Sequence, residues 1–410
     1  MFTPVMFIEL DSLVTTLSLV YFYYFKLWNQ FYSNIMTTAG KPIQCRAAVA
    51  WEVNKPFSLE IVEVSVPKKG EVRVKMASTG VCHSDLHVLE GIDKSYPFPG
   101  VFGHEGAGVI ESVGEGVVSV KPGDKVVLVF ESYCGDCDNC KSTKTHLCRK
   151  TPRNQLQMDG TSRIACKGKA LSQMNSISTF SEYTVTSEFN VAKVNSAANP
   201  NILCLAGCCI PTGYGAVMNA GQVTPGSSCA IWGLGGVGMC VVMGCRDSGA
   251  AKIIGLDVNS SKFQLAKEFG CTDVLNPKEV NVPQKLAEMT GGGPDFCFVS
   301  VGLIPVMEQA FNSCHPAWGK TVVIGLSDIG ATMKVGIWEL IYGRKLVGTS
   351  YGGYKTRIGI PKLVDKVLSG QIQLEKLITH RLPLEKINEG FNMLTTGESL
   401  RSIIDFDLKA

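Results

Sequence analysis

One stretch in the second half of the chain decides the fold: Ser-Cys-Ala-Ile-Trp at 228–232, Gly-Leu-Gly-Gly-Val-Gly at 233–238 and Met-Cys-Val-Val-Met-Gly-Cys-Arg-Asp-Ser at 239–248. An apolar run of strand length meets a glycine-rich turn, and an apolar run of helical length follows. A second apolar strand comes next, and its Asp257 lies nineteen positions beyond Gly238. Strand, turn, helix, strand and acid in this order indicate a dinucleotide-binding βαβ unit rather than a structural turn with a surface Asp.

Each position of the turn has a physical task in such a unit. Gly233 makes the tight turn, Gly235 lets the backbone approach a pyrophosphate, and Gly238 lets the helix pack on the sheet. The N-terminus of the helix then receives the phosphates. Asp257 would accept hydrogen bonds from the adenosine ribose hydroxyls and would repel a 2′-phosphate. The sequence therefore predicts NAD as the cofactor in preference to NADP.

The alternation of strands and helices continues downstream. The expected strands lie at 252–258, 273–275, 295–301 and 321–326, and the expected helices at 262–269, 282–289 and 305–314. Repeated strand and helix predict a parallel, doubly wound sheet. Before residue 200 the pattern is one of short apolar-polar alternations, such as 71–76 and 126–130, broken by Pro and Gly turns. The fold class is therefore α/β, with a β-rich, barrel-like domain beside the parallel sheet.

The composition excludes several classes of function. The 410 residues carry 39 Lys and Arg against 36 Asp and Glu, a formal charge of +3, and no long basic run, so nucleic-acid binding is not expected. Sixteen cysteines occur without a convincing secretory signal before them. This combination indicates a cytoplasmic protein with reduced thiols and thiolate metal sites rather than a disulfide-linked one.

The first 35 residues differ in composition from the rest. Their uncharged apolar run, 12–25, is too short to span a bilayer comfortably, and no basic region precedes it. We expect residues 1–35 to be a disordered or artefactual extension, with translation of the native protein starting at Met36. Membrane attachment or organelle targeting is the alternative, although no membrane partner is expected.

Four cysteines share one turn-rich, polar loop: Cys134, Cys137, Cys140 and Cys148. Four thiolates close a tetrahedral shell, which is the arrangement of a structural zinc site. An iron–sulfur cluster is the rival interpretation, but the last spacing is long and Arg149 rather than Pro follows it. Free core thiols are a poorer explanation, because the loop is polar.

A second cluster of candidate ligands lies upstream. Catalytic zinc takes three protein ligands and keeps one open position. Cys82 and His104 are candidates, and the third ligand would be Cys204, Cys208 or Cys209, among which spacing does not choose. Other polar residues occur beside them in the sequence, namely His83, Ser84, Asp85, His87 and Glu105.

From Met36 to Ala410 the chain resembles the zinc-dependent medium-chain alcohol dehydrogenases, in particular the animal group of the liver enzymes and the glutathione-dependent formaldehyde dehydrogenase. The resemblance is carried by Gly-His-Glu-Gly-Ala-Gly at 103–108 with Gly114 beyond it, by the four-cysteine loop, by Thr-Gly-Tyr-Gly at 212–215 and by the glycine-rich turn, in family order. It implies a GroES-like catalytic zinc domain at 36–209 and 351–410, with a Rossmann NAD-binding domain at 210–350 between the two parts.

The resemblance also implies the metal sites. Cys82, His104 and Cys208 would hold a catalytic zinc ion, and the four-cysteine loop a structural one, so that each subunit binds two Zn²⁺. Glu105 would lie behind the catalytic zinc, and Asp85 would orient His104.

Cofactor contacts follow from the same likeness and from the turn. His83 and Arg401 would approach the pyrophosphate, Lys262 the adenosine ribose, and residues 324–326 the nicotinamide. The expected cofactor-binding residues are His83, Thr212, Gly233, Leu234, Gly235, Gly236, Val237, Gly238, Asp257, Lys262, Ile324, Gly325, Leu326 and Arg401.

The implied reaction is oxidation of primary or secondary alcohols to aldehydes or ketones, and the reverse, by hydride transfer to NAD. The metal would lower the pKa of the alcohol hydroxyl, and Ser84 and His87 would relay its proton to solvent. Phe130 and Ile164 would line an apolar substrate channel. The alternative substrate is S-(hydroxymethyl)glutathione, but His87 differs from that branch and no Arg aligns with its carboxylate contact, Arg153 being one place away. A homodimer joined through the nucleotide-binding sheets is expected.

Overall fold

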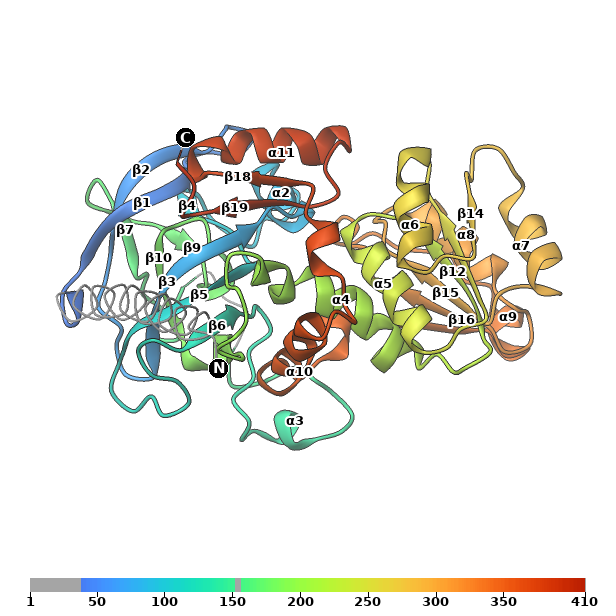
Figure 1. Ribbon diagram of the computed structural model, residues 1–410, viewed down its shortest axis with the longest axis horizontal. Helices are drawn as coiled ribbons and strands as arrows, with labels where there is room; N and C mark the ends of the chain where they lie inside the picture. The colour runs from blue at the N-terminus through green and yellow to red at the C-terminus, as the bar shows by residue number, and fades with distance from the viewer. Residues whose placement is uncertain (1–37, 152–155, 410) are drawn as a thin grey trace, which may run out of the picture.

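The computed structural model describes residues 38–151 and 156–409, which form two lobes side by side (Figure 1). The expected extension at 1–35, the expected start at Met36, and Arg153 lie outside the described residues. No helix in the described ranges is long and apolar enough to cross a bilayer. The first lobe is rich in β-strands and contains both the early part of the chain and its last sixty or so residues, whereas the middle of the chain forms the second lobe.

Two sheets build the β-rich lobe. One has the strand order β8-β7-β2-β1-β4-β9, and the other has the order β11-β6-β5-β3-β19-β18 with β10 also paired to β3. Most of these pairs are antiparallel, and the two core clusters between them consist of alternating apolar side chains, as a half-buried strand requires. The strands are β1 Ile43–Ala50, β2 Ser58–Val64, β3 Glu71–Gly80, β4 Gly100–Val101, β5 Gly106–Val113, β6 Lys125–Leu128, β7 Ile164–Cys166, β8 Lys169–Ala170, β9 Ser172–Gln173, β10 Tyr183–Ser187, β11 Val191–Lys193, β18 His380–Leu382 and β19 Ser402–Asp405.

Short helices complete this lobe. They are α2 His83–Leu89, α3 Asp138–Lys141, α10 Thr356–Leu368 and α11 Ile387–Thr396. The lobe is the β-rich domain that the sequence predicted beside the parallel sheet.

Six parallel strands form the sheet of the second lobe, in the order β14-β13-β12-β15-β16-β17. Numbered along the chain this is 3-2-1-4-5-6, so the strand order reverses beside the first strand, where doubly wound sheets bind dinucleotides. The strands are β12 Ser228–Trp232, β13 Lys252–Leu256, β14 Asp273–Leu275, β15 Phe296–Val299, β16 Lys320–Val323 and β17 Lys345–Gly348. The predicted Rossmann architecture is confirmed, although the strand expected at 321–326 ends at Val323.

Helices cover both faces of this sheet. Side chains of α5 and α6 pack with one face of the central strands, and side chains of α7 and α8 pack with the other. α5 is buried on nearly every side, which explains why its sequence is apolar throughout rather than amphipathic. The helices are α5 Gly236–Asp247, α6 Phe263–Phe269, α7 Val282–Thr290, α8 Ile304–Ser313 and α9 Ile337–Ile341.

The two lobes share a hydrophobic core where α4, Cys209–Gly215, lies against α5. A Cβ atom at Gly213 would lie 2.2 Å from the carbonyl oxygen of Val237, so only glycine permits this approach. The same core cluster continues through α10 into the β-rich lobe. α4 therefore holds the end of the first lobe beside the glycine-rich turn of the second.

Candidate active site and zinc centres

Three loops bring four candidate metal ligands together. Cys82 precedes α2, His104 precedes β5, and Cys208 joins the short helix Leu203–Gly207 to α4. The ligand atoms of these three residues and of Glu105 all lie within 4.8 Å of one another, and all four side chains are buried. Of the three cysteines among which spacing does not choose, Cys208 is the one that the structure brings into this candidate group.

The other two cysteines of that segment lie elsewhere. Cys209 Sγ is 3.9 Å from Cys240 Sγ, inside the core between α4 and α5. Cys204 is fully buried, and desolvation raises the pKa of its thiol to about 12. Cys204 packs in the hydrophobic core and is not part of the candidate ligand cluster.

The donor set fits zinc on chemical grounds. The Nδ1 atom of His104 lies 3.1 Å from Asp85 Oδ1, which also accepts the backbone N–H of Gly103 at 3.0 Å. The Nε2 atom of His104 is buried and has no hydrogen-bond partner among the described residues. The neighbouring Cys208 thiol lowers the pKa of Cys82, and the His104 ring lowers it further. An imidazole nitrogen without a partner beside a readily ionised thiol is the arrangement a zinc ion would complete.

Glu105 extends this cluster toward the second lobe. Its Oε2 atom contacts Arg401 Nη2, whereas its Oε1 atom and Arg401 Nε have no hydrogen-bond partner among the described residues. Burial raises the pKa of Glu105, and Arg401 opposes that rise. Gly80 leaves the space for this pair, because a Cβ atom there would lie 2.1 Å from Glu105 Oε2. Glu105 thus contributes a carboxylate oxygen to the candidate ligand cluster, and the Arg401 guanidinium holds its Oε2 atom.

Helix α2 carries the predicted relay residues. Ser84 and His87 lie one turn apart on the same face and are both half-buried. Ser84 Oγ lies 3.9 Å from Cys82 Sγ, so the hydroxyl borders the metal position. His83, the first residue of α2, remains exposed. Ser84 and His87 therefore lie on a partly exposed face of α2, between the candidate ligand Cys82 and solvent.

An aromatic wall lies on the other side of His104. The Phe130 ring packs edge-on against the His104 ring, with centroids 5.4 Å apart, and against the Tyr351 ring, with centroids 4.8 Å apart. The sequence analysis predicted Phe130 here and missed Tyr351, which is buried and distant in the chain. Its only sequence signal is its place before two glycines, Gly352 and Gly353, where the chain returns to the first lobe.

The prediction that Ile164 lines the same channel is wrong. Ile164 lies in β7 and is buried in the core of the first sheet, packed among strands β1 and β2. The reason is the alternation of β7, whose inward side chains fill the barrel core.

The four-cysteine loop forms a second cluster. The Sγ atoms of Cys134, Cys137, Cys140 and Cys148 all lie within 4.8 Å of one another. Backbone N–H groups of Cys137 and Cys140 point at the sulfur atoms of Cys134 and Cys137 at 3.3 Å and 3.5 Å. Donation from the backbone of Arg149 and Cys140 lowers the pKa of Cys137 to about 6. Four converging thiols in one polar loop, with backbone N–H groups directed at two of the sulfur atoms, fit a closed structural zinc site.

The glycine-rich turn joins β12 to α5 as the sequence predicted. Gly233 has a φ of +91°, and a Cβ atom at Gly238 would lie 1.8 Å from the carbonyl oxygen of Gly233. A Cβ atom at Gly235 would meet nothing within 4 Å, so that position is open to a ligand. A Cβ atom at Gly236 would meet Arg401 Cδ at 2.5 Å, which places the arginine stem beside the start of α5.

Asp257 lies at the same end of the sheet, directly after β13. Its Oδ2 atom accepts the backbone N–H of Leu234 at 2.8 Å and lies 3.3 Å from Lys262 Nζ. Ile324 and Gly325 both donate their backbone N–H to Val299, at 2.9 Å, and so follow β16 at the carboxyl edge. Two predicted contacts belong to other elements: Thr212 lies one turn beyond Cys208 on α4, and His83 is the first residue of α2.

Comparison with known proteins agrees with this geometry. Residues 68–196 match the model of the alcohol dehydrogenase GroES-like domain, and residues 236–368 match that of zinc-binding dehydrogenases. The chain is similar to the structure of an alcohol dehydrogenase zinc-binding domain protein from Burkholderia ambifaria, with 35% identity, a TM-score of 0.84, and coverage of 89% of this chain and 99% of that one. The chain belongs to the zinc-binding medium-chain alcohol dehydrogenase family.

Two further members of the fold are known from solved structures. Benzyl alcohol dehydrogenase from Acinetobacter calcoaceticus is 31% identical, with a TM-score of 0.83 and coverage of 88% of this chain and 99% of that one. A short chain alcohol dehydrogenase from E. coli, solved with NADH, is 24% identical, with a TM-score of 0.73 and coverage of 88% and 99%, and supports the fold alone.

Membership in this alcohol dehydrogenase family makes the chain a zinc-dependent oxidoreductase of the alcohol dehydrogenase type with two candidate zinc sites. The narrower group expected from the sequence, that of the animal liver and formaldehyde enzymes, stays a prediction.

Proposed function

We propose that this alcohol dehydrogenase oxidises primary and secondary alcohols to aldehydes and ketones, and reduces them in reverse, by hydride transfer to and from NAD. One observation carries the proposal. The stem of Arg401 lies against Gly236 in the dinucleotide turn, and its guanidinium contacts Glu105 in the metal cluster. The metal position and the cofactor turn are therefore only one arginine side chain apart, which suits direct transfer between two bound reactants.

The residues of this chain take separate roles in that reaction. Cys82, His104 and Cys208 would hold the catalytic zinc ion, which when bound acts as a Lewis acid and lowers the pKa of the alcohol hydroxyl. Ser84 accepts the hydroxyl proton, and His87 passes it to solvent at the half-buried end of α2. Asp85 fixes the orientation of the His104 ring through its Nδ1 atom.

Apolar and charged groups position the two reactants. Phe130 offers an aromatic face to the carbon chain of the alcohol and excludes water from the metal position. Arg401 and His83 neutralise the pyrophosphate, and Lys262 borders the adenosine ribose. The preferred cofactor is NAD because Asp257 would accept the ribose hydroxyls and repel a 2′-phosphate. The division into a catalytic part, 36–209 with 351–410, and a cofactor part, 210–350, follows from the same assignment.

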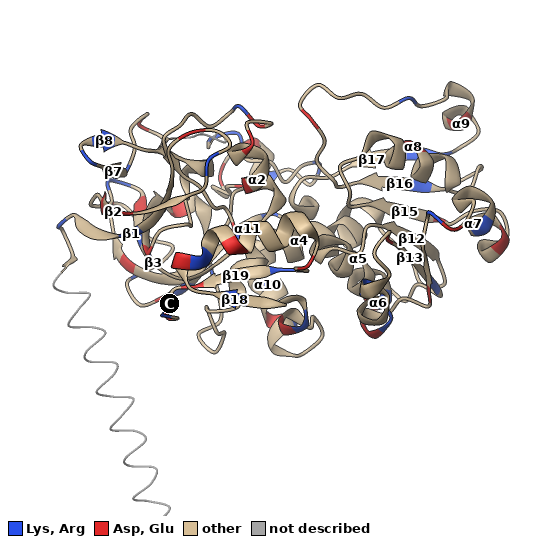
Figure 2. Ribbon diagram, turned by 90° about the horizontal axis from the view of Figure 1, so that it is seen from above, with Lys and Arg blue, Asp and Glu red and all other residues tan. Residues whose placement is uncertain are grey.

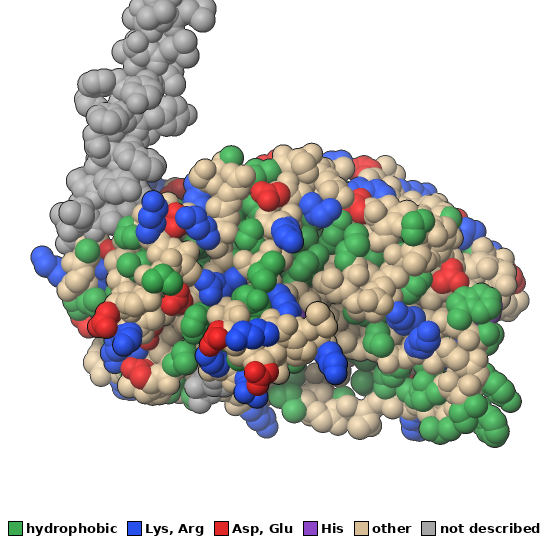
Figure 3. All heavy atoms as spheres, turned by 90° about the horizontal axis from the view of Figure 1, so that it is seen from below, with side chains coloured by type: hydrophobic (Ala, Val, Ile, Leu, Met, Phe, Trp, Pro, Cys, Tyr) green, Lys and Arg blue, Asp and Glu red, His purple; other side chains and the backbone are tan. Residues whose placement is uncertain are grey.

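We infer that a second copy of the chain covers one end of the cofactor lobe. β17 is the edge strand of the parallel sheet, and α9 before it exposes Ile337, Trp338 and Ile341, each more than 60% exposed. Figure 3 shows hydrophobic side chains gathered at this end of the lobe, at the lower right. Two such edges related by a twofold axis would pair antiparallel and bury both apolar surfaces, which gives a homodimer.

The cysteines and the distribution of charge indicate the cellular compartment and the partner of the enzyme. All sixteen cysteines are free thiols in the structure, and two thiolate zinc sites suit the reducing cytoplasm. Lys and Arg residues are interspersed with Asp and Glu residues along the ribbon of both lobes (Figure 2). The partner we propose is a small alcohol or aldehyde.

Activity of the zinc-loaded full chain tests the proposal. NADH formation is measured with ethanol, octanol and benzyl alcohol, with formaldehyde plus glutathione, and with NADP replacing NAD. Simple alcohols should turn over with NAD. A kcat/KM for the glutathione adduct that exceeds all alcohols by orders of magnitude would instead assign the chain to S-(hydroxymethyl)glutathione oxidation.

A matched pair of variants separates the metal role from folding. Cys82→Ala should abolish turnover and leave NADH binding intact, whereas Cys204→Ala removes a buried thiol of the same lobe outside the ligand set and should keep turnover. Near-normal turnover of Cys82→Ala would overturn the ligand assignment.

A further inference from the structure

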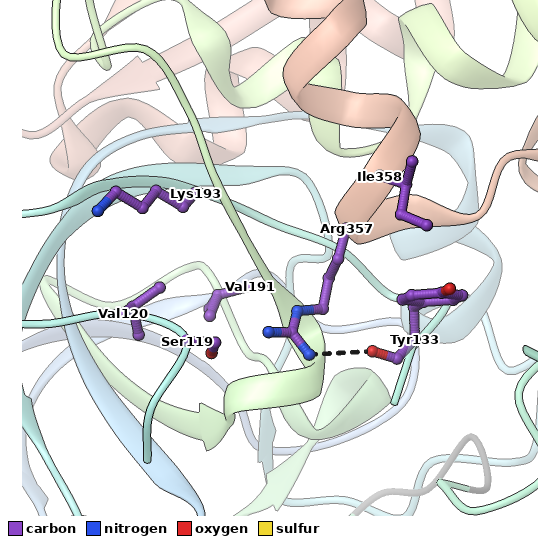
Figure 4. A pocket seen from close by; sticks show the side chains of 7 residues that line it. All are labelled: Ser119, Val120, Tyr133, Val191, Lys193, Arg357 and Ile358. Atoms are coloured by element: carbon purple, nitrogen blue, oxygen red, sulfur yellow. Dashed lines mark hydrogen bonds between the residues drawn. The ribbon is translucent and has the colours of Figure 1, made fainter. Parts of the chain in front are cut away.

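A surface pocket of about 310 Å³ lies in the β-rich lobe, and none of its lining residues is a predicted zinc ligand or cofactor contact. This volume falls at the lower end of small-molecule sites, which span roughly 300–1,000 Å³. Four segments meet there: the turn before β6, the end of β11, the start of α10 and the residue before the four-cysteine loop. Its lining residues are Ser119, Val120, Tyr133, Val191, Lys193, Arg357 and Ile358 (Figure 4).

Arg357 is the central polar group of the pocket. Its guanidinium points into the space between Val191 and Tyr133 (Figure 4). The Nη1 atom donates to the carbonyl oxygen of Tyr133 at 3.2 Å, and the guanidinium carbon lies 5.8 Å from the centre of the Phe189 ring. Within residues 38–151 and 156–409, no carboxylate oxygen lies within ion-pair distance of Arg357. A half-buried guanidinium without a counter-ion is thus held in place by one carbonyl and one aromatic ring.

The other polar groups of the pocket already have partners. Lys193 Nζ lies 2.9 Å from Asp124 Oδ1, and Ser119 Oγ donates to Glu188 at 2.7 Å. Arg357 is therefore the cation left for a ligand.

Apolar side chains complete the lining. Val120 and Val191 are buried beneath the pocket, whereas Ile358 is 47% exposed. Ile358 and the Tyr133 ring therefore supply the accessible apolar surface beside the guanidinium. This combination suits a ligand with one anionic end and an apolar body.

We propose that this pocket binds a small carboxylic acid anion with an aromatic or aliphatic body, separately from the catalytic cleft. The guanidinium can donate two parallel hydrogen bonds to a carboxylate, and the body of the acid lies against Ile358 and the Tyr133 ring. Inorganic phosphate fits less well, because it has no apolar part and the pocket supplies only one unpaired cation for its charge.

The test uses 4-fluorobenzoate as the probe and the zinc-loaded full chain. Fluorine NMR measures its dissociation constant for the wild type, for Arg357→Gln and Arg357→Lys, and for the control Arg381→Gln, which removes an exposed arginine of β18. Arg357→Gln should weaken binding about tenfold or more, because a charge-assisted pair of hydrogen bonds is lost. The affinity of Arg357→Lys should lie between those of the wild type and Arg357→Gln, and the affinity of Arg381→Gln should match that of the wild type. Turnover of alcohol should be unchanged in all three variants.

Competition distinguishes this pocket from the cleft. Saturating benzyl alcohol with NAD should leave the probe bound, and inorganic phosphate should displace it only at concentrations well above that of the probe. Equal affinity of the wild type and Arg357→Gln, full displacement by the alcohol, or absence of binding to the wild type would each overturn the proposal. Tighter binding of phosphate than of the probe would overturn the assignment to carboxylates.

Discussion

Two glycines of the dinucleotide turn, three residues apart, should respond to the same substitution in opposite ways. In Gly238→Ala, the added Cβ atom would lie 1.8 Å from the carbonyl oxygen of Gly233. An ordinary contact needs 3.4 Å or more, so α5 must move about 1.6 Å from the turn. The obstacle is backbone and cannot swing away. We therefore expect the upper end of the usual overpacking cost, about 3 kcal/mol.

Gly235→Ala should leave the fold intact. Gly235 is the N-cap of α5 with φ −76° and ψ −174°, a conformation open to alanine, and its Cβ atom would meet nothing within 4 Å. Replacing glycine in a compatible conformation stabilises a protein by about 0.4–1 kcal/mol through the unfolded state. The methyl group would, however, occupy the space through which the pyrophosphate approaches the backbone. We expect NADH binding to weaken about tenfold or more.

Thermal melting without cofactor and fluorescence titration with NADH measure the two effects separately. Each kcal/mol changes the Tm of a domain of this size by about 2–4 °C, so Gly238→Ala should melt about 6–12 °C lower and Gly235→Ala at or slightly above the wild type. A Gly238→Ala protein that melts like the wild type would refute the packing argument. Undiminished NADH affinity in Gly235→Ala would show that the pyrophosphate does not lie on this turn.

Three further changes test other parts of the structure. Cys134→Ala should lower the bound zinc from two ions per chain to one and lower the Tm, because three thiolates leave the loop open; zinc analysis showing two ions would contradict the structural site. Asp257→Ser should raise the kcat/KM for NADP relative to NAD about tenfold or more, since the repulsion of a 2′-phosphate is removed, and an unchanged ratio would contradict the role of the carboxylate. Burial opposes ionisation of Asp295, but donation from Ser228 and Trp318 outweighs it and lowers its pKa, so its contribution to stability is present above the unfolded pKa of about 3.9 and is lost as the pH falls. The Tm difference between wild type and Asp295→Asn should therefore shrink between about pH 7 and pH 3, and a difference that grows would refute this sign.

The sequence predicted those features that depend on residues close together in the chain. The four-cysteine loop could be identified because all its ligands fall within one turn-rich segment, where chain length forces them together. The strand and turn at 228–238 were also predictable, since apolar runs and glycines act over a few residues. The strand expected at 321–326 is too long because that prediction also used only the local pattern. The chain leaves the sheet after Val323, but the apolar pattern continues beyond it.

Longer-range contacts could not be predicted in the same way. Spacing alone left Cys204, Cys208 and Cys209 equal as third ligands, and only the packing of α4 on α5 turns Cys208 toward His104 and Cys209 toward Cys240. Tyr351 was missed because the whole cofactor lobe separates it from Phe130 in the sequence, although the two rings are in contact.

The sequence by itself determined the family, the order of the two lobes, the thiolate loop and the glycine turn, because each depends on neighbouring residues or on a motif that covers most of the chain. Only the tertiary structure decided that Arg401 joins Glu105 to the dinucleotide turn and that Ile164 belongs to the barrel core. It also decided that Arg357 faces a pocket with no counter-ion from the described part of the chain. The physical reason is that these arrangements depend on side chains hundreds of residues apart, whose distances are set by the packing of whole sheets and helices rather than by the local chain.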